Sequence, residues 1–121
     1  MPTISAVVDG RKPTDVAFSG ESSAFTWNPL ANGDDGAAVQ YGAFTDRSIQ
    51  FAGTFGTGGT VVLEGSNDGT NWQTLTDPQG NVISKTAASI EAVTEATRYI
   101  RPRVTAGDGT TAIKAILFVR G

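Results

Sequence analysis

Five aspartates are the residues of this chain best suited to acid–base chemistry, because the sequence contains no histidine and no cysteine. That absence also excludes a Ser–His or Cys–His nucleophile pair. General acid–base catalysis needs titratable groups paired in a cleft. Each candidate instead stands in a turn rich in Gly, Asn or Pro, where an aspartate ordinarily binds nearby backbone N–H groups. We therefore predict that these five aspartates are turn residues and that the protein is not an enzyme. They are Asp34, Asp35, Asp68, Asp77 and Asp108.

Metal and phosphate binding depend on the same turns. Asp34-Asp35-Gly36 and Asn67-Asp68-Gly69 offer hard oxygen ligands, but neither continues into a twelve-residue calcium loop that ends on Glu. A calcium site in one of these loops stays an open alternative. The glycine-rich run at 53–59 lacks the Lys-Ser/Thr of a phosphate loop and joins two expected strands. We expect no cofactor and no Cys/His metal site.

Three aromatic residues, Trp27, Trp72 and Tyr99, could form a platform on which sugar rings stack. In a small sandwich, a tryptophan beside an apolar strand more often belongs to the core. We predict that Trp27 and Trp72 are core residues; exposure of either beside polar groups would favour sugar binding.

The charges are distributed unevenly. The formal net charge of −3 argues against nucleic acid as a partner. Residues 1–91 carry four basic and ten acidic side chains, and residues 92–121 carry five basic and two acidic ones. Either the two parts pair internally, or the basic part faces an acidic partner. In the second case Arg101, Arg103 and Arg120 are the candidates for contact with a partner's acids.

Short apolar stretches separated by turns indicate an all-β protein. The best defined is the hairpin of Gly53–Trp72, whose turn Ser66-Asn67-Asp68-Gly69 suits left-handed backbone. Pro29 should end the second strand, and Pro102 indicates an edge strand or a bulge. Residues 85–96 fit a short strand or a single helical turn. The expected strands are Thr3–Val8, Ala24–Asn28, Arg47–Phe55, Thr60–Gly65, Trp72–Thr76, Val82–Ser84, Thr97–Thr105 and Thr110–Arg120.

This pattern predicts one domain over residues 1–121, a jelly-roll-like β-sandwich of about eight short antiparallel strands. Residues 9–23 are polar and broken, and we expect an arm or loop there, with Arg11 and Lys12 as candidate partner contacts. The last strand is apolar on both faces, since Ile116 and Phe118 oppose the core-facing residues. We expect other loops or another subunit to cover Ile116 and Phe118.

Residues 1–20 show no apolar stretch typical of a signal peptide, and no run approaches the roughly 18 apolar residues that span a bilayer. We expect a protein made in the cytoplasm, without a membrane partner.

Two short segments, Leu63–Trp72 and Arg98-Tyr99-Ile100-Arg101, resemble parts of discoidin-type (coagulation factor C-type) sandwich domains, which bind sugars or membrane lipids. The resemblance covers about a fifth of the chain and lacks the disulfide common in that family. The matching residues are structural in the family, so they imply a fold more than a ligand.

A broader resemblance covers several segments: Trp27-Asn28-Pro29-Leu30, Asp46 to Gly56, the hairpin at 65–72, Asp77 to Asn81, Arg101 to Val104 and Gly107 to Thr111. Together they are similar to the small decoration or cement proteins on the capsids of tailed bacteriophages. The resemblance implies a structural virion protein on the capsid exterior that contacts the major capsid protein and stabilises the shell. It also implies a homo-oligomer, with a dimer favoured and a trimer possible. The alternative is a discoidin-like carbohydrate-binding module of a phage tail or receptor-binding apparatus.

Overall fold

The computed structural model describes residues 3–11, 22–40 and 45–121, and all of its regular structure is β-strand. No helix long enough to span a membrane occurs in these ranges. The strands of the described residues are β1 (Thr3–Ile4), β2 (Val7–Arg11), β3 (Ser22–Leu30), β4 (Asp35–Gly36), β5 (Val39–Gln40), β6 (Asp46–Thr54), β7 (Thr60–Ser66), β8 (Gln73–Thr74), β9 (Ser84–Lys85), β10 (Ser89–Ala92), β11 (Tyr99–Ala106) and β12 (Ala112–Arg120). There are twelve of these strands where eight were predicted, because β4 and β5 were not expected, β10 was one of two alternatives for its segment, and the expected strand at 3–8 is divided into β1 and β2.

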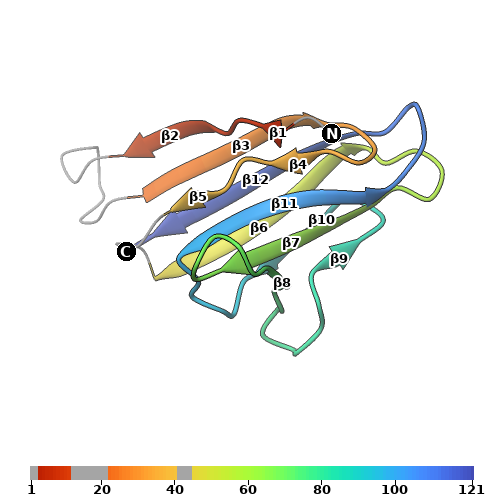
Figure 1. Ribbon diagram of the computed structural model, residues 1–121. Helices are drawn as coiled ribbons and strands as arrows, with labels where there is room; N and C mark the ends of the chain where they lie inside the picture. The colour runs from red at the N-terminus through yellow and green to blue at the C-terminus, as the bar shows by residue number, and fades with distance from the viewer. Residues whose placement is uncertain (1–2, 12–21, 41–44) are drawn as a thin grey trace.

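The strands form two sheets that pack as a sandwich (Figure 1). One sheet has the order β10-β6-β12-β3-β2, and the other has the order β1-β4-β11-β7-β8, with β5 beside β11 and β9 beside β7. From β3 onward the chain crosses repeatedly from one sheet to the other, so that β12 lies between β3 and β6 while β11 lies between β4 and β7. This is the strand order of a jelly roll, and it confirms the predicted sandwich.

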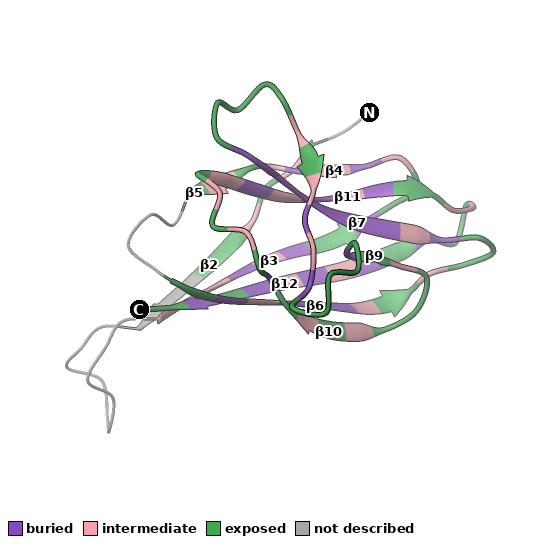
Figure 2. Cartoon of the chain, turned by 90° about the horizontal axis from the view of Figure 1, so that it is seen from below, coloured by how far each residue is buried: buried purple, intermediate pink, exposed green. Residues whose placement is uncertain are grey.

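Strand β12 is the centre of the five-stranded sheet. It pairs antiparallel with β6 from Ala112 to Arg120 and with β3 from Ile113 to Arg120. Residues of opposite faces alternate along each strand, and Figure 2 shows buried residues along β3, β7, β11 and β12. The core between the sheets contains Phe25, Trp27, Leu30, Ile49, Phe51, Val61, Leu63, Leu75, Ile83, Val93, Ile100, Val104, Ile113, Ala115, Leu117 and Val119.

The prediction that Trp27 is a core residue is confirmed. Its side chain is fully buried, and its Nε1–H donates a hydrogen bond to the carbonyl oxygen of Ala37 at 3.0 Å. Gly36 in β4 allows this close packing, because a Cβ atom there would lie 2.6 Å from Pro102 Cδ and 2.9 Å from Trp27 Cδ1. The tryptophan therefore joins the two sheets and is not accessible to a ligand.

Two proline predictions are corrected. Strand β3 does not end at Pro29; it continues to Leu30 through a cis Asn28–Pro29 peptide, beside a register shift in its pairing with β12. Pro102 lies in an interior strand, β11, opposite the gap between β5 and β4. Both prolines occupy places where the ladder is interrupted, so their missing N–H groups are tolerated inside a sheet.

Other boundaries also differ from the prediction. Of the two alternatives for residues 85–96, the short strand is confirmed by β10, and β9 begins just before this range at Ser84. The expected strand at 72–76 is reduced to β8 and an isolated bridge between Thr76 and Val82. At the ends of the polar segment 9–23, residues 9–11 of β2 pair with residues 22–24 of β3, because backbone pairing does not require apolar side chains. The rest of that segment, 12–21, lies outside the described residues.

Candidate interaction surfaces

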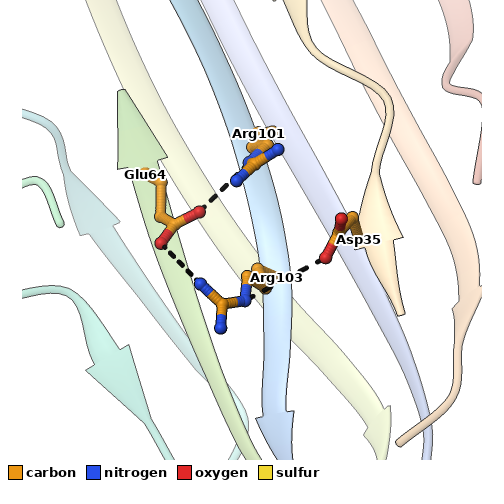
Figure 3. A network of polar contacts seen from close by, with 4 residues as sticks. All are labelled: Asp35, Glu64, Arg101 and Arg103. Atoms are coloured by element: carbon orange, nitrogen blue, oxygen red, sulfur yellow. Dashed lines mark hydrogen bonds and ion pairs between the residues drawn. The ribbon is translucent and has the colours of Figure 1, made fainter. Parts of the chain in front are cut away.

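The outer face of the seven-stranded sheet carries a network of four charged residues (Figure 3). Arg101 lies opposite Glu64 across the β11–β7 pair, and Arg103 lies opposite Asp35 across the β11–β4 pair. Arg101 Nε donates to Glu64 Oε1 at 3.1 Å, and Arg103 Nη1 donates to Glu64 Oε2 at 3.3 Å. Arg103 Nε also lies 4.0 Å from Asp35 Oδ1. The register of three strands thus brings Glu64 beside both guanidinium groups and Asp35 beside that of Arg103.

Exposure within this network is graded. The side chain of Glu64 is 9% exposed, that of Arg101 is 21% exposed and that of Arg103 is 43% exposed. A guanidinium group has five N–H donors, and the hydrogen bonds to Glu64 use one from each arginine. The exposed part of Arg103 can therefore bind an external acceptor while Glu64 keeps its side chain in place.

Trp72 corrects a prediction, because it is half-buried and does not belong to the core between the sheets. The guanidinium carbon of Arg101 lies 4.0 Å from the centroid of its ring, a cation–π contact. Arg98 lies similarly over the ring of Tyr99, at 5.1 Å. An arginine therefore covers one face of each ring, which leaves less of the ring for sugar stacking.

The outer face of the five-stranded sheet is chemically different, and it carries Ile116 and Phe118, both predicted as contacts. One row of directly paired residues crosses all five strands, and the next row crosses β3, β12, β6 and β10. Neither row has a charged side chain on those strands; in β2 the backbone partner of Ala24 is Asp9. The first row is Val7, Thr26, Ile116, Gln50 and Ile90, and the second is Ala24, Phe118, Ser48 and Ala92. We call these nine residues the uncharged face.

Large apolar side chains are exposed on the uncharged face. Val7 is 71% exposed, Ile90 is 63% exposed and Phe118 is 41% exposed. Ile116, in the middle of the face, is partly exposed. Within the described residues, no loop of the chain buries these side chains. Of the two expectations for Ile116 and Phe118, coverage by another subunit therefore stays a prediction.

A depression of about 440 Å³ lies at one end of this face. Asp46 and Arg120 flank it; they form an ion pair at 3.3 Å in which both side chains are 64% exposed. Neither tryptophan lines it. The lining residues are Thr45, Asp46, Arg47, Ser48, Ala92, Val93, Phe118 and Arg120.

Beneath the depression, polar groups close the end of the sandwich. The Arg47 guanidinium donates to the carbonyl oxygens of Thr45, Val93 and Thr94 at 2.7 to 3.4 Å. Glu95 accepts hydrogen bonds from the backbone N–H and the hydroxyl of Thr76. Burial raises the pKa of Glu95, but these hydrogen bonds and the charge of Arg47 outweigh it and bring the pKa below its ordinary value.

Four of the five candidate aspartates are turn residues, as predicted. Asp34 accepts from the N–H of residue 31, and Asp77 accepts from the N–H groups of residues 79 and 81. The N–H groups of residues 71 and 70 hold the pKa of Asp68 well below its usual range. The hydroxyl of residue 110 and the N–H of residue 57 do the same for Asp108. Asp35 is the exception, since it faces Arg103.

The candidate partner contacts are thus distributed over both faces. Arg101 and Arg103 pair with Glu64, and Arg120 pairs with Asp46, so the internal pairing between the two parts of the chain is present for these three arginines. Arg11 ends β2, and Lys12 lies outside the described residues. In the described residues, acidic side chains do not gather in groups of three that could hold a metal ion.

Sequence reasoning missed Glu64 and Asp35 as partners of the arginines, and Val7 and Ile90 as parts of the uncharged face. Alternation along the strand at 60–65 places Glu64 on the other face of the strand from Val61 and Leu63. This alternation is the signal in the sequence that indicates an outward position for Glu64. Which strands lie beside it depends on sheet order, and periodicity within one strand does not reveal that.

Comparison with known proteins supports the fold. The sequence matches no protein-family model and none of the curated proteins. Among solved structures, the chain is similar to the SPBc2 prophage-derived protein YomS, with a TM-score of 0.66, 11% identity and coverage of 95% of this chain and 96% of that chain. A weaker similarity is to tailspike protein 4 of bacteriophage CBA120, at 13% identity and a TM-score of 0.22 over 97% of this chain and 16% of that one. This TM-score is too low to indicate a shared fold. The first similarity shows the same sandwich fold over nearly the whole of both chains.

Proposed function

We propose that this protein is a structural component of a bacteriophage particle, and more specifically a cement protein that binds the outside of the capsid. Its partners are neighbouring subunits of the major capsid protein, and it acts by contact without chemistry. It is made in the host cytoplasm and located on the exterior of the virion.

The observation that carries the proposal is the full-length similarity in fold to a prophage-derived protein, with 95% of this chain and 96% of that chain aligned. A fold by itself hosts many functions, so this similarity supports a phage origin as an analogy. It agrees with the independent resemblance of several sequence segments to phage decoration proteins.

The charged network suggests how the protein would contact a shell. Arg103 has a partly exposed guanidinium group, and the ion pair between its Nη1 and Glu64 Oε2 holds the orientation of that group. A guanidinium group held in this way suits a carboxylate of a partner, because its fork of donors matches the two acceptor oxygens. Many such modest contacts repeated over a lattice add up through multivalency.

Stabilisation follows from mass action. A protein that binds the assembled lattice and not the separated subunits raises the free energy of opening the shell by RT ln(1 + [L]/Kd). At a concentration of 100 times Kd this is about 2.7 kcal/mol for each site.

Co-sedimentation tests the proposal. Shells of the parent phage assembled without this protein are mixed with the purified protein and pelleted, and free capsid subunits are treated in parallel. The proposal predicts that the protein pellets with shells and does not bind free subunits. Arg103→Gln should weaken binding to shells, whereas the matched control Lys114→Gln, on the opposite sheet, should not.

Equal binding to shells and to free subunits, or no binding at all, would overturn the proposal. The carbohydrate-binding alternative has its own outcome: the protein would bind oligosaccharides without shells, and sugar would change the fluorescence of Trp72.

A further inference from the structure

We propose that the uncharged face of the five-stranded sheet binds a second copy of this chain, in a symmetric dimer whose two-fold axis runs parallel to the strands between β12 and β6. The inference concerns the isolated protein and does not depend on the proposed role at a capsid.

The first reason is the composition of the face. Two adjacent rows of side chains cross β3, β12, β6 and β10 without a charge, and Ile90, Ile116 and Phe118 stand on them. The opposite sheet shows that this is not general for the molecule, since its outer face carries the network of Glu64 and two arginines. Facing an identical surface, these two rows remove apolar area from water without desolvating a charge of their own. The charged neighbours on the same face lie at either end of the two rows: Lys114 beyond Ile116, and the Asp46–Arg120 pair beyond Phe118.

The second reason is charge complementarity at the margin of the face. Arg120 of β12 lies directly opposite Asp46 of β6 in the sheet. A two-fold axis between these strands exchanges their positions, so Arg120 of each copy faces the partner's Asp46. The two ion pairs inside the copies thus become a cluster of four alternating charges. A two-fold axis on β12 itself would instead place Arg120 against the partner's Arg120, which disfavours that arrangement.

The third reason is shape. The same axis places Phe118 over the partner's Ser48, because these two residues are also directly paired in the sheet. Ser48 and Ala92 line the depression at this end of the face. Each Phe118 ring therefore has a recess to enter on the other copy, and the exchange is reciprocal as an isologous interface requires.

The size of the face sets the expected strength. Two rows about 6.6 Å apart across four strands about 4.8 Å apart, with the margin of Asp46 and Arg120 on two of them, cover roughly 300 Å² of flat area per copy. The pair therefore buries at least about 600 Å², which is below the usual size of specific interfaces. We expect a weak dimer that forms toward the upper end of the concentration range from about 1 μM to about 1 mM.

Sedimentation equilibrium of the purified protein between about 1 μM and 1 mM tests the dimer. The mass should rise from that of one chain to that of two, and no further. Phe118→Glu and Ile90→Glu should each weaken association at least tenfold, because each places a charge in the apolar contact. The matched control is Val82→Glu, at an exposed valine that lies on neither of the two rows, and it should leave the mass curve unchanged. Circular dichroism confirms that each variant is folded.

A complementary pair of charge variants identifies the axis. Asp46→Arg gives a copy with two basic side chains at the margin, and Arg120→Glu gives a copy with two acidic ones. Each variant alone should be monomeric, and their equimolar mixture should form heterodimers. Both variants have lost the ion pair within the copy, so recovery on mixing reports contact between copies.

A single-chain mass at every concentration would overturn the proposal, as would a trimer or a dimer that survives both Phe118→Glu and Ile90→Glu. A dimer that those variants weaken, but that the mixture of charge variants does not restore, would overturn the assigned axis.

Discussion

Replacement of Glu64 by glutamine tests whether the carboxylate holds the two arginines of the charged network. Glutamine keeps the size of the side chain but offers one acceptor oxygen and turns an NH2 group toward the other guanidinium group. The side chain of Glu64 is 9% exposed, so water replaces the lost interactions only in part. Since Arg101 lies over the ring of Trp72, its release should also change the surroundings of that ring.

The size of the effect follows from exposure. A buried hydrogen bond between charged groups contributes about 1.5–3 kcal/mol, and Arg101, which is 21% exposed, should lose about 1.5 kcal/mol. Arg103 is 43% exposed, and solvent reduces its loss to about 0.5 kcal/mol. An unfolding entropy of about 2.1 cal/mol/K per residue gives about 0.25 kcal/mol/K for this chain, so about 2 kcal/mol lowers Tm by roughly 8 °C.

Differential scanning calorimetry of dilute protein measures this difference. The control is Asp46→Asn, which breaks an ion pair whose side chains are both 64% exposed and should lower Tm by no more than about 2 °C. In about 1 M salt the effect of the control should vanish, whereas most of the Glu64→Gln effect should remain, because buried pairs are screened less. A Tm change for Glu64→Gln equal to that of the control would refute the reasoning.

Three further predictions concern single residues. Iodide should quench the fluorescence of the wild-type protein but not of Trp72→Phe, because the remaining tryptophan is fully buried; quenching of the variant would contradict its place in the core. Glu95 has a lowered folded pKa, so its stabilisation is present above its unfolded value and is lost as pH falls through the folded value; Glu95→Gln should therefore flatten the loss of Tm below about pH 4.5, and an unchanged acid profile would contradict the assignment. Gly36→Ala should cost roughly 1–3 kcal/mol in chemical denaturation, since its Cβ would lie 2.6 Å from Pro102, whereas Gly109→Ala, with open space around it, should be close to neutral.

The sequence was informative wherever one strand's own pattern determines the answer. Ile49 and Phe51 alternate with Ser48 and Gln50, and the structure buries the first two and leaves Gln50 exposed. Trp27 was placed correctly for the same reason. The turn aspartates were also predictable, because nearly all of their hydrogen bonds reach only a few residues along the chain; the exception is the bond that Asp108 accepts from the N–H of Thr57.

Contacts between distant segments could not be predicted in the same way. Trp72 was expected in the core, yet Arg101, 29 positions later, lies over its ring on the outer face. Asp35 was expected to cap a turn, but the β4–β11 pairing turns it toward Arg103. In each case sheet order decides which side chains meet, and sheet order depends on the packing of the whole sandwich. The apolar second face of β12 was visible in the sequence, and its neighbours on β2 and β10 were not.

The measurement that tests the proposed function most directly is the temperature at which shells of the parent phage release their DNA, recorded with increasing amounts of this protein. A cement protein should raise that temperature progressively, until the lattice sites are saturated, and Arg103→Gln should need a higher concentration for the same increase. A release temperature that does not change while the protein is bound to the shells would contradict the account.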